Sequence, residues 1–390
     1  MRARSLLGDA VEPHGQPGRD TREPVADNQL TGIVHRPHGD GGVSRVPETN
    51  PLTGTRDRSS SCGQRGPRLR RMFAITAAAA TPDDPLAGLT LGDHPDPEVP
   101  DGWELVEVRA AGLNHHDLWT LRGVGISPDR LPIVLGCDAA GVTADGREVI
   151  VHSVIGELDG GDETLGSFSI LSEQYDGTFA DRVAVPARNL VPKPESLSFE
   201  EAACLPTAWL TAYRMLFTRG ALAPGQRVLI QGAGGGVATA AILLARAAGL
   251  HITVTSRDET KLERARQIGA HVTVAAGERL PARVDAVIET VGEATWSHSL
   301  KALEPGGVVV VSGATSGSNP PADLGRVFFR QLRVVGSTMG TKDELVRLVR
   351  LLDATGVRPL IDDTLPMGEA PTAFQRMLDG ELFGKIVLTR

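Results

Sequence analysis

The stretch VLIQGAGGGVATAAILLARAAG, residues 228–249, decides the fold. Its first four residues end the apolar run QRVLIQ (226–231), which is typical of a strand buried on both faces of a parallel sheet. Apolar and small residues then recur at helical spacing over 237–249, and Gly249 is a helix stop. The stretch therefore predicts a strand, a glycine-rich turn and a helix in direct succession.

The glycine-rich turn has the composition of a phosphate-binding turn. A strand must bend abruptly into a helix whose free N–H groups face a diphosphate, with no side chain in the way. A tight turn without a ligand is the alternative interpretation, but placement between a buried strand and a helix favours dinucleotide binding. The predicted contacts are Gly232, Ala233, Gly234, Gly235, Gly236 and Val237.

The end of the second predicted strand, HITVTS (251–256), indicates which dinucleotide binds. NAD sites carry an acidic side chain there, beside the ribose 2′-hydroxyl. Here Ser256 and Arg257 occupy that place, and Lys261 follows one helical turn later. A hydroxyl and two cations suit a 2′-phosphate, whereas the alternative is that they are surface charges at a helix start. With Asp258 interpreted as the helix cap, NADPH is the predicted cofactor and NADH the alternative.

Strand–helix alternation continues after this point. A helix is expected over 258–269 and buried strands over 284–292, 307–314 and 332–339, which predicts a doubly wound parallel α/β sheet. Before the sheet, short alternating strands (103–114, 146–154, 177–186) indicate a mostly β, barrel-like domain. A helix capped by Ser198 is expected over 196–217. The tail 342–390 predicts one amphipathic helix and a closing strand at 385–388.

Composition excludes several classes of partner. The formal net charge is −8, and the body of the chain has no basic stretch, which argues against nucleic acid and anionic membranes. No run approaches the ~18 apolar residues that span a bilayer. Cys62, Cys137 and Cys204 are too few and too far apart for a disulfide framework. A reducing compartment, the cytoplasm, is therefore predicted.

The first 71 residues differ from the rest of the chain. They carry twelve Arg and no Lys, with hardly any apolar periodicity. Such a segment cannot bury enough surface to offset its ordering entropy, and it lacks the apolar core of a signal peptide. Residues 1–71 are predicted to be a disordered extension without chemistry, or a misassigned start before Met72.

Seven segments, in their order and spacing, carry a family resemblance. They are AAGLNHHDLW (110–119), LGCDAAG (135–141), LSFEEAACLPTAWLTAYRML (197–216), VLIQGAGGGVATAAILLARAAG (228–249), RDETKLERARQIGA (257–270), LRVVGSTMG (332–340) and FGKIVL (383–388). From Met72 onward the chain resembles the medium-chain dehydrogenase/reductases, in particular zinc-free quinone oxidoreductases and alcohol dehydrogenase-like reductases. The resemblance implies a Rossmann domain (195–337) inserted in a GroES-like, mostly β catalytic domain (72–194 and 338–390). It also implies a homodimer formed through edge strands.

The resemblance predicts that the family's catalytic zinc is absent. At the positions of its three zinc ligands this chain has Asn114, Cys137 and Thr207, and two of these are poor ligands. The four-cysteine lobe of a structural zinc is also missing, since 151–176 contains no cysteine. A site rebuilt from Cys137, Asp138 and either His115 or His116 is the alternative.

Without a metal, hydride transfer depends on proximity and on hydrogen-bond donors to the acceptor oxygen. The candidates near the cleft are Asn114, His115, Asp117 and Trp119, the last through its indole N–H. The alternatives are that Asp117 is a cap or loop anchor and that Asn114 only braces its loop. The sequence names no proton donor among them.

Further cofactor contacts follow from the resemblance and from the carboxyl edge of the predicted sheet. They are Thr211, Thr290, Gly292, Gly313, Ala314, Phe329 and Lys385, with a core role as the alternative for Phe329. The predicted function is that of an enzyme that uses NADPH to reduce a small-molecule substrate, namely a quinone, an enone or an aldehyde. A zinc-type alcohol dehydrogenase with a rebuilt site and a non-catalytic NADP(H)-binding sensor are the alternatives.

Overall fold

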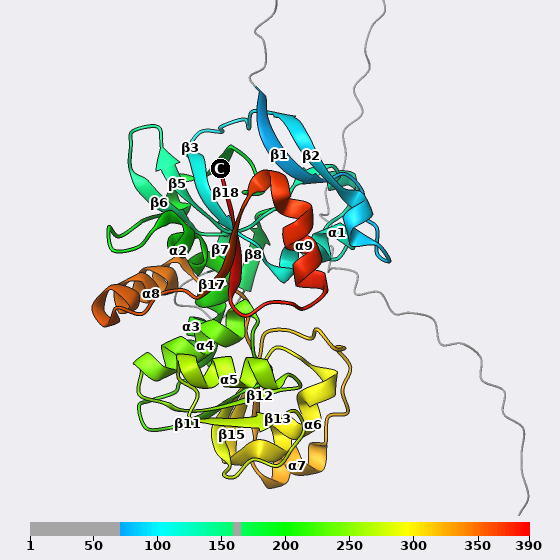
Figure 1. Cartoon of the computed structure of the whole chain (residues 1–390), viewed down its shortest axis with the longest axis vertical. Helices are drawn as coiled ribbons and strands as arrows, with labels where there is room; N and C mark the ends of the chain where they lie inside the picture. The colour runs from blue at the N-terminus through cyan, green and yellow to red at the C-terminus, as the bar shows by residue number, and fades with distance from the viewer. Residues whose placement is uncertain (1–70, 159–164) are drawn as a thin grey trace, which may run out of the picture. The chain divides into compact units, whose positions relative to one another are not determined.

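A computed structural model describes residues 71–158 and 165–390 (Figure 1). The predicted extension therefore lies outside the described residues, except for Arg71, which begins strand β1 (Arg71–Ala77). No helix in the described ranges has the length and apolarity to cross a bilayer.

The predicted parallel sheet is present and has six strands in the order β13-β12-β11-β14-β15-β16, all paired in parallel. Their bounds are β11 Arg227–Ile230, β12 His251–Ser256, β13 Val272–Ala275, β14 Val284–Glu289, β15 Leu303–Val311 and β16 Arg333–Gly336. The intervening helices are α4 Gly236–Ala247, α5 Glu259–Ile268, α6 Glu293–Ala302 and α7 Leu324–Phe329. Strand order reverses beside β11, the position where open α/β sheets bind ligands at the carboxyl ends of their strands.

Most of the remaining strands form a second, largely antiparallel system. β10 (Leu190–Pro192), β6 (Glu148–Val151), β5 (Ala139–Thr143), β3 (Trp103–Gly112), β18 (Lys385–Thr389) and β17 (Ile361–Pro366) follow one another, and β9 (Arg182–Pro186) pairs with β3. A separate sheet joins β2 (Leu89–Pro95), β1 and β4 (Ile133–Val134), and β7 (Val154–Leu158) pairs with β8 (Leu165–Ile170). Because β18 lies antiparallel to β3, the C-terminal segment returns to the first domain. The parallel sheet is thus inserted in a mostly β domain, as the sequence predicts.

The helix expected before the parallel sheet needs correction. The helix expected over 196–217 is divided into α2 (Phe199–Ala203), a π-helical turn η4 (Leu205–Trp209), α3 (Leu210–Tyr213) and a second π-helical turn η5 (Arg214–Arg219). Pro206 has no N–H to donate, which interrupts the α-helical ladder at η4. The Ser198 cap is present, with its hydroxyl accepting from Glu201 N at 3.1 Å.

The tail holds more structure than expected. Besides the amphipathic helix α8 (Lys342–Thr355) it forms β17 and α9 (Ala370–Leu378) (Figure 1). β17 reads IDDTLP, and its two acidic residues break the apolar run that would have marked a strand. The edge strand β13 (Val272–Ala275), which pairs with β12, was also missed by sequence reasoning, since it is only four residues long.

Candidate functional site

The glycine-rich turn has the geometry of a diphosphate-binding turn. Gly232 and Gly234 have φ of +80° and +105°, which side chains rarely adopt, and Gly235 precedes the first helical residue of α4. A Cβ on Gly236 would lie 2.8 Å from Cδ of Lys385. The absence of a side chain at Gly236 therefore leaves room for the stem of Lys385. The turn therefore leaves the first N–H groups of α4 approachable by an anion.

The predicted contacts at the ends of β14 and β15 come together beside this turn. A Cβ on Gly292 would lie 2.9 Å from Cα of Ala314, and one on Gly313 would lie 3.0 Å from the carbonyl oxygen of Thr290. A Cβ on Gly232 would lie 3.4 Å from Cγ2 of Val291. These residues thus lie along one edge of the parallel sheet. A dinucleotide bound at the glycine-rich turn would extend along this edge.

Sequence reasoning missed the residue that holds this edge, the fully buried Glu289. One of its oxygens accepts from Val291 N at 2.8 Å and from Gly292 N at 3.0 Å. Ser299 Oγ donates to the other oxygen at 2.5 Å. A carboxylate at the end of an apolar strand was the available signal, because buried acids need such donors.

The three residues predicted at the 2′-phosphate have different environments. Ser256 ends β12, and its Oγ accepts from Asp258 N at 3.1 Å. Asp258 caps α5 as expected, accepting from Thr260 N at 2.8 Å, so its charge is engaged. Lys261 Nζ donates to Gly380 O at 2.6 Å, while Arg257 is exposed. Arg257 is therefore the more available cation, and Lys261 links α5 to the C-terminal segment.

Lys385 connects the glycine turn to the catalytic domain. Its side chain is 3% exposed, and its ammonium donates to Leu113 O and to Asn114 Oδ1, both at 2.6 Å. Oδ2 of Asp138 lies 3.4 Å away and forms a buried ion pair with it. The sequence prediction of a cofactor contact thus falls on a lysine whose charge is already engaged inside the protein, while its stem lies against Gly236.

Asn114 and Asp117 fit the bracing roles that were the alternatives to catalysis. Asn114 Nδ2 donates to Asp138 Oδ2 at 2.8 Å and to Gly112 O at 3.0 Å. Asp117 is fully buried and accepts from Asn114 N at 2.8 Å and from Gly136 N at 3.1 Å. Burial raises the pKa of Asp117 to about 6. Asp117 therefore anchors the start of helix α1 (His115–Leu121) to the loop at Gly136.

The structure brings together the three positions at which the family resemblance places a zinc site. Cys137 Sγ lies 3.4 Å from Thr207 Oγ1 and 3.5 Å from Asn114 Nδ2. Asn114 Nδ2 donates to the sulfur, and Asn114 Oδ1 accepts from the Lys385 ammonium. Burial raises the pKa of the Cys137 thiol well above its usual range. This donor set does not fit a zinc ion, which needs three good protein ligands.

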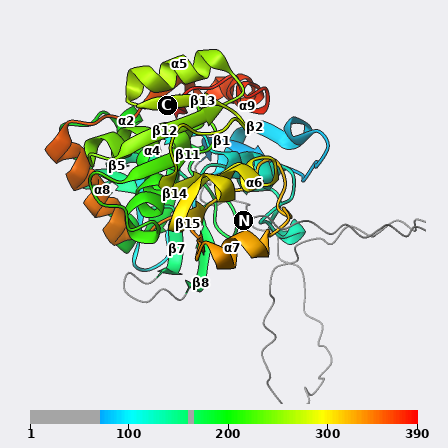
Figure 2. The same cartoon turned by 90° about the horizontal axis from the view of Figure 1, so that it is seen from below.

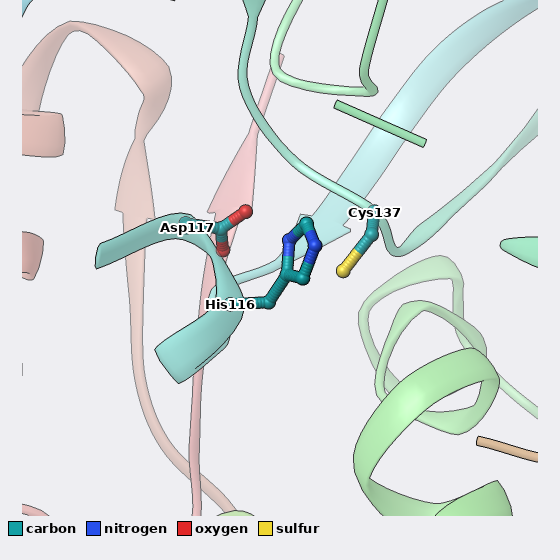
Figure 3. A group of neighbouring side chains, drawn as sticks. All are labelled: His116, Asp117 and Cys137. Carbon is teal, nitrogen blue, oxygen red and sulfur yellow. The ribbon is translucent and has the colours of Figure 1, made fainter. Parts of the chain in front are cut away.

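A second set of potential ligand atoms belongs to His116, Asp117 and Cys137, which lie within 4.8 Å of one another (Figure 3). It overlaps the rebuilt site that was the sequence alternative, with Asp117 in place of Asp138. Each oxygen of Asp117 already accepts a backbone N–H. Nε2 of His116 is engaged by Glu173 at 3.1 Å, but its Nδ1 has no hydrogen-bond partner among the described residues. The set therefore offers one free histidine nitrogen, whereas a zinc ion needs three good protein ligands.

The other catalytic candidates lie on α1. His115 reaches solvent, yet protein atoms crowd its ring, and this desolvation, with the charges of Lys385 and Arg122, lowers its pKa. Trp119 is 36% exposed on the same helix. Of the remaining cofactor candidates, Thr211 is buried on α3. Phe329 is 81% exposed, so its alternative core role is wrong.

Comparisons with known proteins give a consistent result. Residues 236–354 match the model of the zinc-binding dehydrogenase family, and 100–195 match that of the alcohol dehydrogenase GroES-like domain. A zinc-type alcohol dehydrogenase-like protein of Schizosaccharomyces pombe is 32% identical over 74% of this chain and 90% of its own length. A crystal structure of an NAD-dependent alcohol dehydrogenase is 33% identical, with a TM-score of 0.76 over 82% of this chain and 100% of that one. A crotonyl-CoA carboxylase/reductase in complex with NADP is 25% identical, with a TM-score of 0.74 over 82% and 95%.

Proposed function

Because the chain belongs to the medium-chain dehydrogenase/reductase superfamily, we propose that it is an NADPH-dependent reductase of a quinone, enone or aldehyde-type acceptor. We further propose that it works without a metal ion. The absence of a metal ion is proposed because the Lys385 ammonium donates to Asn114 Oδ1, and Asn114 stands at the position of a family zinc ligand.

The choice of cofactor rests on the end of β12. The similar structures include both an NAD-dependent enzyme and an NADP complex, so family membership does not decide it. The carboxylate of Asp258 is turned to the amides of α5, and Arg257 extends into solvent beside it. An exposed guanidinium suits a 2′-phosphate better than a bare ribose hydroxyl.

The chain's own residues hold and orient the dinucleotide, which supplies a hydride when bound. The first amides of α4 would bind its diphosphate, as the dipole of that helix favours an anion. The edge formed by Thr290–Gly292 and Gly313–Ala314 would line its path, with Glu289 fixing that edge. A quinone or an enone is electrophilic without a Lewis acid, so its reduction fits a metal-free site better than alcohol oxidation does.

The test is an acceptor screen with both nicotinamide cofactors on metal-analysed protein. We expect NADPH to be preferred, and Arg257→Ala to raise the KM for NADPH about 10–100-fold, because a charge-assisted hydrogen bond contributes roughly 1.5–3 kcal/mol. The KM for NADH should stay unchanged, and Arg257→Lys should fall between the two. A preference for NADH, or activity that chelation removes together with stoichiometric zinc, would contradict the proposal.

We also propose a homodimer formed through the β16 edge of the parallel sheet, in the cytoplasm. β16 is the last strand in that sheet, and Val334 on it is 49% exposed. Leu324, Phe328 and Phe329 on α7 are 70%, 64% and 81% exposed. In both views α7 lies at the end of the sheet opposite α5, as the strand order requires (Figures 1 and 2). An unpaired edge beside exposed aromatic rings is typical of a surface that pairs.

Phe329→Asp is therefore expected to weaken dimerisation at least about tenfold, since it places a charge in an apolar contact. Sedimentation velocity across a concentration series measures this. Val99→Asp, which changes an exposed valine on the catalytic domain, is the matched control and should leave the dimer intact. A wild-type protein that sediments as a monomer at micromolar concentration would disprove this arrangement.

A further inference from the structure

A chain of buried hydrogen bonds runs beneath the proposed dinucleotide site, and Gln231 stands at its centre. Gln231 lies between β11 and the glycine-rich turn, and it is 1% exposed. A buried amide needs partners for both its oxygen and its nitrogen, because an unpaired polar atom costs more than a hydrogen bond contributes. The partners of this amide lie on β12 and on α6, on either side of β11 and β14.

The amide oxygen connects to the adenosine side of the site. Thr255 Oγ1 donates to Gln231 Oε1 at 2.6 Å, and Thr255 is itself 1% exposed. Because its one hydrogen is used in this way, Thr255 Oγ1 can only accept elsewhere, and it accepts from Gly232 N at 3.4 Å. Thr255 directly precedes Ser256, which ends β12 at the proposed 2′-phosphate position. This first branch therefore joins the amide to the segments that would hold the adenosine and the diphosphate.

The amide nitrogen connects to the opposite side of the site. Gln231 Nε2 donates to Ser299 Oγ at 2.9 Å, and Ser299 Oγ donates in turn to Glu289 Oε2 at 2.5 Å. The other oxygen of Glu289 accepts from Val291 N and Gly292 N. Since β14 follows β11 in the sheet, a dinucleotide with its adenosine at β12 and its diphosphate at β11 continues over β14. This second branch therefore ends at the loop beneath the nicotinamide half.

His298 fixes the orientation of the amide. Its Nε2 lies 2.8 Å from the carbonyl oxygen of Glu278, which can only accept, so Nε2 carries the proton. Nδ1 then accepts the second N–H of Gln231, at 2.9 Å. A reversed amide would direct its oxygen at this acceptor nitrogen. The amide therefore has one favourable orientation, with its oxygen towards β12 and its nitrogen towards α6.

We propose that Gln231 is a positioning residue, which holds the adenosine-side and nicotinamide-side loops at the spacing that a bound dinucleotide needs. The proposal rests on the proposed dinucleotide-dependent function and divides its binding site into two separable halves. Interrupting the Thr255 branch should weaken any ligand that carries the adenosine and the diphosphate. Interrupting the Ser299 branch should weaken only a ligand that also extends over β14.

Calorimetry with two ligands tests this division. The ligands are NADPH and adenosine 2′-phosphate 5′-diphosphate, which is NADPH without its reduced nicotinamide riboside. Thr255→Val keeps the shape of threonine and should raise the Kd of both ligands about tenfold, which corresponds to the loss of one buried hydrogen bond. Ser299→Ala should raise the Kd of NADPH about tenfold and leave that of the fragment within about twofold.

Gln231→Met should weaken the binding of both ligands, because it interrupts both branches while keeping the length of the side chain. Adding Ser299→Ala to Gln231→Met should cause no further loss of NADPH affinity, since the two changes interrupt the same chain of bonds. Thr253→Val is the matched control, because it makes the same replacement at a buried threonine of β12 that belongs to neither branch. It should leave the Kd of both ligands unchanged.

Thermal unfolding of each variant separates positioning from support of the fold. A lower Tm with unchanged Kd values in Gln231→Met would mean that the amide only stabilises the protein, which would overturn the proposal. An equal loss for NADPH and the fragment in Ser299→Ala would also overturn it, because the two halves would then not be separable. If Gln231→Met does not fold, Thr255→Val and Ser299→Ala decide the question. Failure of wild type to bind either ligand would instead defeat the proposed function, and this is seen before any variant is compared.

Discussion

Replacing Gly235 by Asp is expected to abolish dinucleotide binding while leaving the fold intact. Gly235 precedes α4 with φ of −68° and ψ of 157°, a conformation open to any residue. A Cβ there meets no atom within 4 Å. Aspartate is a favoured N-cap, so the helix should be as stable as before or slightly more stable. Its carboxylate would, however, occupy the mouth of the turn and repel a diphosphate.

We expect the Kd for NADPH to rise at least about 100-fold, since like charges in a partly desolvated site cost several kcal/mol. Calorimetry measures binding, and thermal unfolding checks that Tm does not fall. Gly235→Ala should cost far less, because it adds bulk without charge. Gly368→Asp adds the same charge where a Cβ also meets no atom, between β17 and α9, and should leave binding unchanged. Undiminished NADPH binding by Gly235→Asp would mean that the diphosphate lies elsewhere.

This turn also shows what a sequence can predict. The strand, the glycines and α4 are consecutive, and the Asp258 cap spans only three residues, so local chemistry determines them. The family resemblance then placed Asn114, Cys137 and Thr207 together, and the structure confirms that they are neighbours. These successes depend on short range or on a known family pattern.

The parts that were missed depend on contacts between distant segments. Lys385 and Asn114 are 271 residues apart in sequence, and Glu173 lies 57 residues from His116. No periodicity indicates that a lysine in an apolar closing strand will have its ammonium inside the catalytic domain. Similarly, the division of the helix over 196–217 depends on packing as well as on Pro206, because π-helical turns recur at Arg214–Arg219, where no proline stands.

The Lys385 ammonium lies at the point where these distant segments meet. It is buried, it donates to Leu113 O and Asn114 Oδ1, and it pairs with the fully buried Asp138. Asp138 keeps two other donors, Asn114 Nδ2 at 2.8 Å and Ser153 Oγ at 3.4 Å. Removing the lysine charge therefore leaves a buried carboxylate with neutral donors only and two oxygens without a partner.

Lys385→Met is accordingly expected to lower the free energy of unfolding by about 3–5 kcal/mol, the usual cost of removing one partner of a buried ion pair. Methionine keeps most of the stem, so the loss reports the charge and not the packing against Gly236. Urea denaturation measures it, and an unchanged m-value would show that the denatured state is unaffected.

The double variant Lys385→Met with Asp138→Asn separates the charge from the hydrogen bonds. If the uncompensated carboxylate causes most of the loss, adding Asp138→Asn should recover part of it, and the two changes should be coupled by roughly 1–3 kcal/mol. Additive losses would mean that the ammonium stabilises the fold mainly through Leu113 and Asn114. In that case the lysine would brace the Asn114 loop against the dinucleotide turn, and its charge would matter little to the site.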